Sequence, residues 1–290
     1  MKGLNEIQLI LILETNMLKE VGRLEPDDFK ELDSIVEKIL KQLQNGKTDL
    51  AKKKIQTLAN TSNYFIRDAL GKLLAAYPDT ETMDQICMEM LDHRVYGIRA
   101  TALFYFYYKN LQNPRKILDI LDKTFETIPW EAESIAFEMW KRNSDVMKEV
   151  MPSWTESDNE KKRALSMHGM ENIAGQDPQF VMSFVGKLID DESLEVQKKI
   201  THILTQVGRL RPNQCYPAIR QWLIEADEKR VKTIWVSMKK LANILVQRSR
   251  RDKSQDFIII TQKTVKEWKA DPNQNVSQMG SRLQQIIGRN

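Results

Sequence analysis

The sequence of 290 residues has few of the residues that make turns and sheets. It holds only 11 Gly and 9 Pro, and the alternation of apolar and polar residues that is typical of strands is hard to find. The one run rich in β-branched residues, 257–261, continues into Lys263, Val265 and Trp268 at helical spacing, so we interpret it as a buried helix face. Charged residues make up 29% of the chain, and Leu, Ile, Lys, Glu, Gln and Met recur throughout. This composition is typical of a helical protein, and we expect no sheet.

Cysteine and histidine are also scarce. Cys87 and Cys215 lie far apart and have no Cys or His at metal-ligand spacing, so we interpret both as ordinary buried thiols. His93 and His168 have no companions at such spacing either. We therefore expect no metal site and no cofactor.

Long apolar runs are absent. The N-terminal LILIL segment is closely flanked by Glu6 and Glu14, and no small-residue cleavage site follows it. It is too short and too charged for a membrane span, and it lacks the pattern of a signal peptide. We expect a cytoplasmic protein that does not contact a membrane and acts as a monomer.

Charge is unevenly distributed, although the net charge is only +4. Residues 236–290 hold 11 Lys and Arg against 4 Asp and Glu, whereas the rest of the chain is slightly acidic. Such a basic segment suits a polyanion such as nucleic acid, and a solvated basic helix face explains it equally well.

A repeat is the main organising feature. A polar turn leads to an aliphatic residue, then to Arg, Gln or Lys, and then to a helix. These anchor pairs are Ile66-Arg67, Ile98-Arg99, Val196-Gln197, Val231-Lys232 and, more weakly, Lys162-Arg163. The intervals between them are 32, 64, 34 and 35 residues, so the long interval predicts a degenerate repeat near residue 130.

Each anchor helix alternates with a further amphipathic segment of one helix length. A single helix pair cannot bury its apolar face, so the pairs must stack, and we predict an all-α, HEAT-like α-solenoid of antiparallel helix pairs with a concave inner surface. We expect one domain over residues 1–290. It comprises an N-terminal helical cap (1–33), the repeats (34–246) and a basic C-terminal helical pair (247–290).

Four segments in sequence order resemble one family. The segment 196–212, VQKKITHILTQVGRLRP, is similar to the helix I-Q-K-A-I-G-W-x-L-R-x-x-x-K-x-x-P of the bacterial DNA alkylation repair proteins, the AlkD and AlkC type of HEAT-like DNA glycosylase. Trp154 with Ser157-Asp158-Asn159 and Arg163 resembles the W-x-x-S-D-N-x-W-x-x-R stretch of that family. WEAESIA at 130–136 and GIRATAL at 97–103 resemble two further segments. The likeness spans about residues 35 to 235.

The resemblance implies a basic cleft that holds double-stranded DNA and removes N3- or N7-alkylated purines by breaking the N-glycosidic bond. An alkylated purine is already a good leaving group, so such a protein mainly stabilises the cationic sugar with a carboxylate and holds the lesion against aromatic walls. The family's catalytic Asp falls on Glu133 in one alignment and on Ser134 in another. One site Trp corresponds to Trp130, and the second is replaced by His202.

The resemblance and the basic residues of the cleft together suggest DNA phosphate contacts. We expect these from Arg99, Lys161, Lys162, Arg163, Lys198, Arg248, Arg250 and Arg251. Lys161 stands where the family has Trp, and Arg163 aligns only after one residue is deleted.

Structural interpretations stand beside these assignments. The anchor side chains Arg67, Arg99, Arg163, Gln197 and Lys232 share one phase of the repeat, so they form either a ladder for phosphate or a row that holds the solenoid together. Glu131 and Glu133 open a helix, where acids are common. A lone His such as His202 is more often structural. Among the Trp residues, we expect 140, 222 and 235 in the core.

Three functions follow for testing. The protein is a DNA-binding protein of alkylation repair that acts as an alkylpurine DNA N-glycosylase, a non-catalytic DNA-binding relative, or a HEAT scaffold that binds a protein partner. The altered site residues leave the enzymatic activity open.

Overall fold

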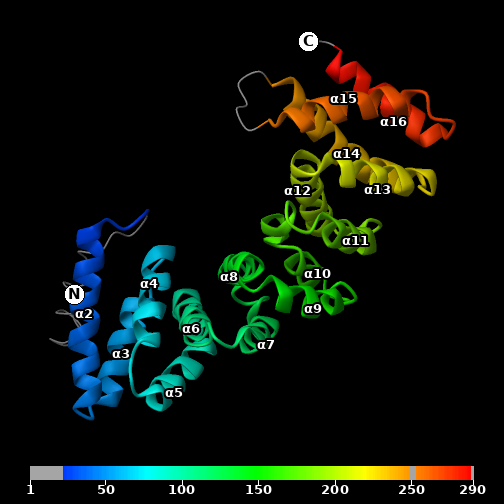
Figure 1. Cartoon of the computed structure of the whole chain (residues 1–290). Helices are drawn as coiled ribbons and strands as arrows, with labels where there is room; N and C mark the ends of the chain where they lie inside the picture. Colours follow the sequence, from blue (N-terminus) through cyan, green and yellow to red (C-terminus); the bar gives the residue numbers. More distant parts are fainter. Residues whose placement is uncertain (1–21, 248–252, 289–290) are drawn as a thin grey trace, which may run out of the picture. The chain divides into compact units, whose positions relative to one another are not determined.

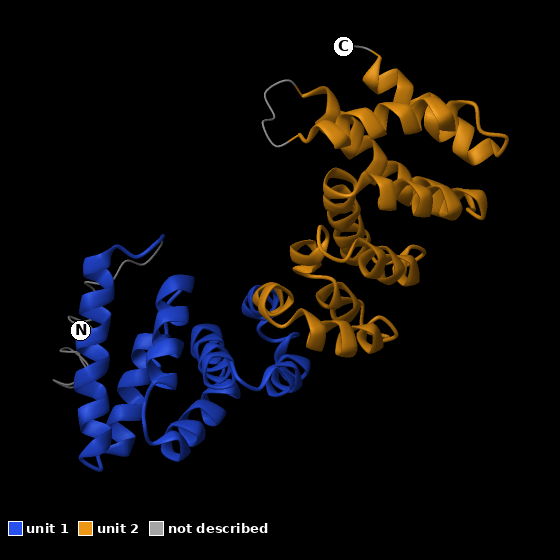
Figure 2. Cartoon of the chain, viewed as in Figure 1, with its two compact units in different colours: residues 1–135 blue, residues 136–290 orange. Residues whose placement is uncertain are grey.

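Helices make up most of the part of the chain that the structure describes. The computed structural model describes residues 22–247 and 253–288, and no strand occurs within them. The chain divides into two compact units, residues 1–135 and 136–290 (Figure 2). The predicted all-α, HEAT-like solenoid of stacked antiparallel helix pairs is confirmed, and each unit is described here by itself.

The described part of the first unit begins with a long helix and continues with helix pairs (Figure 1). Its helices are α2 (Pro26–Gln44), α3 (Thr48–Ala59), α4 (Tyr64–Ala75), α5 (Thr80–Leu91), α6 (Tyr96–Lys109), α7 (Pro114–Thr124) and the start of α8 (Pro129–Arg142). Residues 1–21 of the predicted cap lie outside the described residues, and α2 runs past the expected cap boundary at residue 33.

Close packing between second helices holds the first unit together. α4 and α6 approach so closely that a Cβ atom at Gly71 would lie 2.5 Å from Cβ of Phe104. Only glycine fits this position without a shift of the neighbouring helix. The core beneath it is continuous and apolar, and includes Leu32, Ile55 and Met83.

The second unit repeats the pattern from the end of α8 onward. It contains α9 (Ser144–Trp154), α10 (Glu160–Ser166), the short 3-10 helix η1 (Met170–Ile173), α11 (Pro178–Leu188), α12 (Leu194–Leu210), α13 (Pro212–Ile224), α14 (Glu228–Val246), α15 (Gln255–Lys269) and α16 (Gln274–Ile287). The run 257–261 lies in α15, as predicted. The helices α12 and α14, which are the second members of adjacent pairs, pack against each other.

The predicted anchors mark the same place in every repeat. Residues 66, 98, 162, 196 and 231 all lie in the first turn of the second helix of a pair, namely α4, α6, α10, α12 and α14. The degenerate slot near residue 130 is the first turn of α8. The sequence period therefore identified the helix pairs correctly, whereas the prediction of one domain over the whole chain stays a prediction.

Buried side chains agree with the sequence interpretation in most places. Both cysteines are free and buried, and burial raises the pKa of each thiol. Trp140 is fully buried and its indole N–H donates to the carbonyl of Ser166 at 3.2 Å. Trp222 and Trp235 were expected in the core but are only half-buried; for Trp235, the Arg282 guanidinium lies 3.7 Å from the ring centroid.

Within the described ranges, no helix has the length and apolarity that crossing a bilayer requires.

Candidate functional site

The anchor side chains perform one structural task in four repeats. Arg67, Arg99, Arg163 and Gln197 each donate a hydrogen bond to the backbone carbonyl of the residue six positions earlier, at 3.0, 2.7, 2.8 and 3.0 Å respectively. Each bond ties the loop between two helices to the helix that follows. A buried carbonyl without a partner is costly, so these bonds stabilise the repeat boundary. These four anchor side chains therefore have a structural role at the repeat boundaries.

The Ser-Asp-Asn segment is a helix cap. The Asn159 side chain accepts from the Lys161 N–H at 2.9 Å and begins α10, while the Ser157 hydroxyl accepts from the Asn159 N–H at 3.2 Å. Arg163 then reaches the carboxylate of Asp191, with Nε–Oδ2 2.6 Å and Nη2–Oδ1 3.1 Å. These residues shape the turn and join two adjacent repeats.

The bidentate contact between Arg163 and Asp191 shifts the pKa values of both groups. Burial by itself raises the pKa of Asp191, but hydrogen bonds from Arg163 and from the Ser193 N–H outweigh it, so this pKa lies below its ordinary value. The same contact raises the pKa of Arg163. The guanidinium also donates to two loop carbonyls, so most of its donors are engaged within the chain.

Glu131, in the first turn of α8, is fully buried. Its carboxylate accepts hydrogen bonds from Arg67 through Nε at 3.1 Å and Nη2 at 2.6 Å, and from the Tyr96 hydroxyl at 2.5 Å. Burial, together with hydrogen bonding to this carboxylate, raises the pKa of Tyr96. Arg67 and Arg99 both lie 5.8 Å from the centre of the Tyr96 ring. The start of α8 is therefore fixed to α4 and α6 of the same unit.

This role of Glu131 was not predicted. Acids at the start of a helix are common and usually solvated, and the partners of Glu131 lie 64 and 35 residues earlier. One signal was available in the sequence. Two arginines of the row pair with buried carboxylates of neighbouring repeats, Arg67 with Glu131 and Arg163 with Asp191, so an anchor Arg indicates that such a partner should be sought.

Trp130 has the opposite environment, because 78% of its surface is exposed although its neighbour Glu131 is buried. Glu133 is half-buried and lies one helical turn after Trp130, on the same side of α8. The Ser134 hydroxyl lies 2.6 Å from the hydroxyl of Tyr64. Three of the predicted site residues thus share the beginning of α8.

His202 lies in the second unit, on α12. Its Nε2 is 3.3 Å from Oε1 of Glu171, and both side chains line a groove of about 310 Å³ together with His168, Lys198 and Lys199. Burial opposes ionisation of Glu171, but its hydrogen bond with His202 contributes to a net lowering of its pKa. His202 is therefore an accessible, hydrogen-bonded side chain at the edge of a polar groove.

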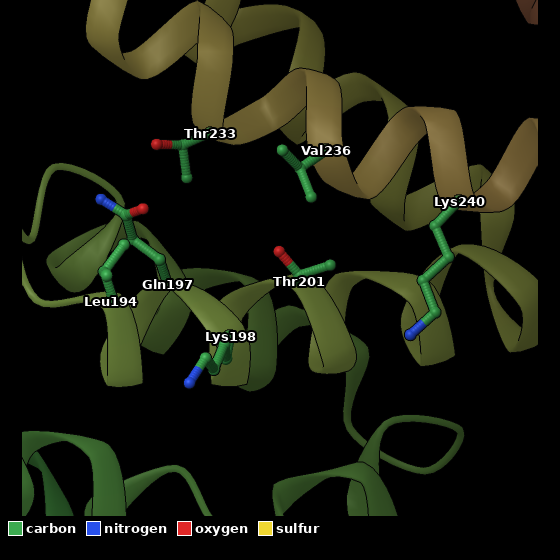
Figure 3. Close-up of a pocket in the computed structure, with 7 residues that line it drawn as sticks. All are labelled: Leu194, Gln197, Lys198, Thr201, Thr233, Val236 and Lys240. Carbon is green, nitrogen blue, oxygen red and sulfur yellow. The ribbon is translucent and has the colours of Figure 1, made fainter.

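A second groove of about 440 Å³ lies between α12 and α14 and shares Lys198 with the first (Figure 3). The other predicted phosphate ligands differ in their surroundings. Lys161 is exposed, and the Nζ atom of Lys162 lies 4.9 Å from the centre of the Trp154 ring. Arg248, Arg250 and Arg251 lie outside the described residues.

Metal ligands do not gather in the described ranges, where no three His, Cys, Asp or Glu side chains are placed to share an ion. The first unit instead offers the exposed indole of Trp130, and the second offers exposed lysines and two grooves lined by both polar and apolar side chains. Such features suit a large, anionic, partly aromatic partner.

Comparisons with known proteins identify a family for the chain. The family described as DNA alkylation repair enzyme matches residues 75–241, more than half of the chain. Among solved structures, an engineered protein is 13% identical over 96% of this chain and 78% of its own, with a TM-score of 0.38. Kap121p bound to Pho4p is 10% identical over 99% of this chain and 36% of its own, with a TM-score of 0.47. Among curated proteins, none matches the sequence.

Proposed function

The chain belongs to the DNA alkylation repair enzyme family, and from this premise we propose that it binds double-stranded DNA and recognises alkylated purines with the first turns of α8. The observation that carries the proposal is the contrast between two adjacent residues. Glu131 is fully buried in an ion pair, whereas Trp130 has 78% of its surface exposed. A single exposed apolar side chain is common on protein surfaces, but an indole ring held on a rigid turn can stack on a base or pack against a sugar.

Phosphate contacts come from lysines in this proposal. Lys161 and Lys198 are exposed, and the ion pair of Lys198 with Glu195 is a solvated i,i+3 pair that exchanges readily for a phosphate. Lys162 lies close to Trp154 and, like Lys161, contributes positive charge at the start of α10. Arg99 and Arg163 hold loops in place, so we assign them an indirect part.

A second candidate function is catalytic. Glu133 lies on the same side of α8 as Trp130 and is half-buried, which is a suitable position for a carboxylate that stabilises a developing sugar cation. In this reaction water adds to the sugar carbon as the bond to the alkylated base breaks, and the base leaves neutral. His202 belongs to the second unit, so this candidate gives it no part in the step.

The experiment uses the full chain and a duplex that carries one N7-methylguanine, with an unmodified duplex as control. Binding is measured by fluorescence anisotropy at several salt concentrations, and base release is measured by chromatography. We expect the logarithm of the binding constant to fall linearly with the logarithm of the salt concentration, because phosphate contacts release counterions. Binding that does not respond to salt, or no binding at low salt, contradicts the DNA proposal.

Base release separates the two candidates. Release above that of buffer supports the glycosylase, whereas salt-dependent binding without release supports the non-catalytic DNA-binding relative. Failure to bind any nucleic acid at low salt leaves the scaffold interpretation, in which a HEAT surface binds a protein.

A further inference from the structure

The groove between α12 and α14 includes exposed apolar side chains, which phosphate binding does not require. Leu194 on α12 and Val236 on α14 line it with 70% and 50% of their surfaces exposed. Figure 3 shows that Val236 points across the groove towards Thr201 on the facing helix. Exposed Leu and Val side chains are common singly, but here two line the same groove, and we refer to this pair as the apolar strip.

Cations border this strip. Lys198 and Lys240 line the same groove, and Figure 3 shows their amino groups pointing to one side of it. Lys240 makes no ion pair within residues 22–247 and 253–288. Of the cations on α14, Lys229 and Arg230 pair with Glu192 and Asp190, whereas Lys240 lines the groove. The border of the groove is thus suited to carboxylates or phosphates.

The spacing of the lining residues identifies the shape of the occupant. On α12 they recur at 194, 197, 198 and 201, and on α14 at 233, 236 and 240, so each helix contributes one stripe of side chains. Two adjacent helices that present parallel stripes form a groove into which the side-chain ridge of a third helix fits. The walls are helices whose backbone groups are already paired, so an extended peptide would find no edge to add to.

The apolar strip argues against DNA as the occupant. A phosphate placed against Leu194 and Val236 would lose water without gaining a hydrogen bond, and that loss is unfavourable. Leucine or methionine side chains of a peptide would instead remove both residues from water.

We propose that the groove between α12 and α14 binds an acidic amphipathic helix of a partner protein, which packs apolar side chains against Leu194 and Val236 and places carboxylates next to Lys198 and Lys240. The proposal goes beyond DNA binding and does not depend on it. Because Lys198 is also assigned a phosphate contact, the peptide and DNA would compete for that residue.

The test selects binders for the full chain from a displayed library of helical peptides about 18 residues long, which is enough to sustain helix in water. Apolar residues occupy one face, and the flanking positions vary among Asp, Glu, Lys, Arg and Gln. We expect enrichment of sequences with Asp and Glu on the flanks. No enrichment, or enrichment of basic flanks, overturns the proposal.

Variants then locate the site of the selected peptide, whose binding is measured by anisotropy. Leu194→Ser and Val236→Ser should each weaken binding about tenfold, because an apolar contact is lost. Ile259→Ser is the matched control, since Ile259 is 52% exposed on α15 and does not line this groove, and it should leave binding unchanged. Circular dichroism confirms that each variant is folded. Equal binding by all three variants overturns the proposal.

Charge reversal completes the test. Lys240→Glu should weaken the selected acidic peptide and strengthen a version of it in which Lys replaces the flanking acids. If instead Leu194→Ser and Val236→Ser weaken duplex DNA and leave the acidic peptide unaffected, the groove belongs to nucleic acid and the proposal fails.

Discussion

Arg67 and Glu131 form a buried ion pair across 64 residues of sequence, with Nη2–Oε1 2.6 Å and side chains that are 8% and 0% exposed. A third group, the Tyr96 hydroxyl, donates to the other carboxylate oxygen. The pair joins the start of α4 to the start of α8, and α6 is tied in through Tyr96. The residue after Pro129, Trp130, owes its position to this network.

Removal of the buried charge should destabilise the protein. Glu131→Gln leaves the Arg67 guanidinium buried without its counter-charge, and loss of one partner of a buried pair costs about 3–5 kcal/mol. We expect that loss in the free energy of unfolding from urea titration at pH 7. Glu138→Gln is the control, because Glu138 pairs with Arg142 on an exposed face of the same helix, and it should cost under about 1 kcal/mol. Equal losses in the two variants would contradict the prediction that the buried network stabilises the protein more than an exposed ion pair does.

The Asp191–Arg163 pair should give the protein part of its stability against acid. The pKa of Asp191 in the folded protein lies below its ordinary value, so the unfolded chain takes up a proton first as the pH falls. Its contribution is therefore fully present well above pH of about 4, the ordinary value for Asp, and is lost as the pH falls through the folded pKa. Asp191→Asn should lower stability at pH 7 by about 2–4 kcal/mol.

The same variant should also lose less stability than the natural chain between pH 6 and pH of about 3, because the titrating group is gone. Urea unfolding across this range measures both quantities. Glu192→Gln is a suitable control, since Glu192 is adjacent, exposed and paired with Lys229. A parallel decline in the natural chain and in Asp191→Asn would contradict the assignment.

The sequence predicted the helix pairs because each repeat is marked by residues that lie close together in the chain. A polar turn followed by an anchor such as Arg67 or Gln197 marks each second helix, and the anchor bonds to a carbonyl only six positions earlier. The same row was open to a phosphate-binding interpretation. Residue type alone does not distinguish the two, because a guanidinium donates equally well to a loop carbonyl and to a phosphate.

Contacts between repeats could not be predicted from the sequence. The partner of His202 is Glu171, which lies in η1 between two helix pairs, and the partner of Ser134 is Tyr64 in another repeat. Such pairings depend on how repeats stack, and the repeat period does not fix that detail. The exposure of Trp130 could not be predicted from the sequence either, because it depends on the burial of Glu131 by earlier repeats.

Trp130 should matter for binding and not for stability. Because 78% of its surface is exposed, Trp130→Ala should change the free energy of unfolding by less than about 0.5 kcal/mol. If the indole stacks on DNA, the same change should weaken binding to the N7-methylguanine duplex by about 1–3 kcal/mol, or roughly 5- to 150-fold. Anisotropy and urea titration provide the two readouts. Phe29→Ala serves as control, because Phe29 is 43% exposed on α2 and should leave DNA binding unchanged.

The position of the proposed catalytic carboxylate can be decided by a pair of substitutions. If Glu133 stabilises the sugar cation, Glu133→Gln should lower the rate of N7-methylguanine release by about a hundredfold or more and leave duplex binding within about twofold, because the charge acts mainly in the transition state. Ser134→Asp tests the alternative alignment. The Tyr64 hydroxyl, 2.6 Å from the Ser134 hydroxyl, can donate to an introduced carboxylate and hold it in place. An increase in release with Ser134→Asp, together with no loss in Glu133→Gln, would assign the reactive position to residue 134, one residue further along α8. Single-turnover base release with excess protein measures both variants, and a rate equal to that of buffer in the natural chain and in both variants would leave α8 with a binding role alone.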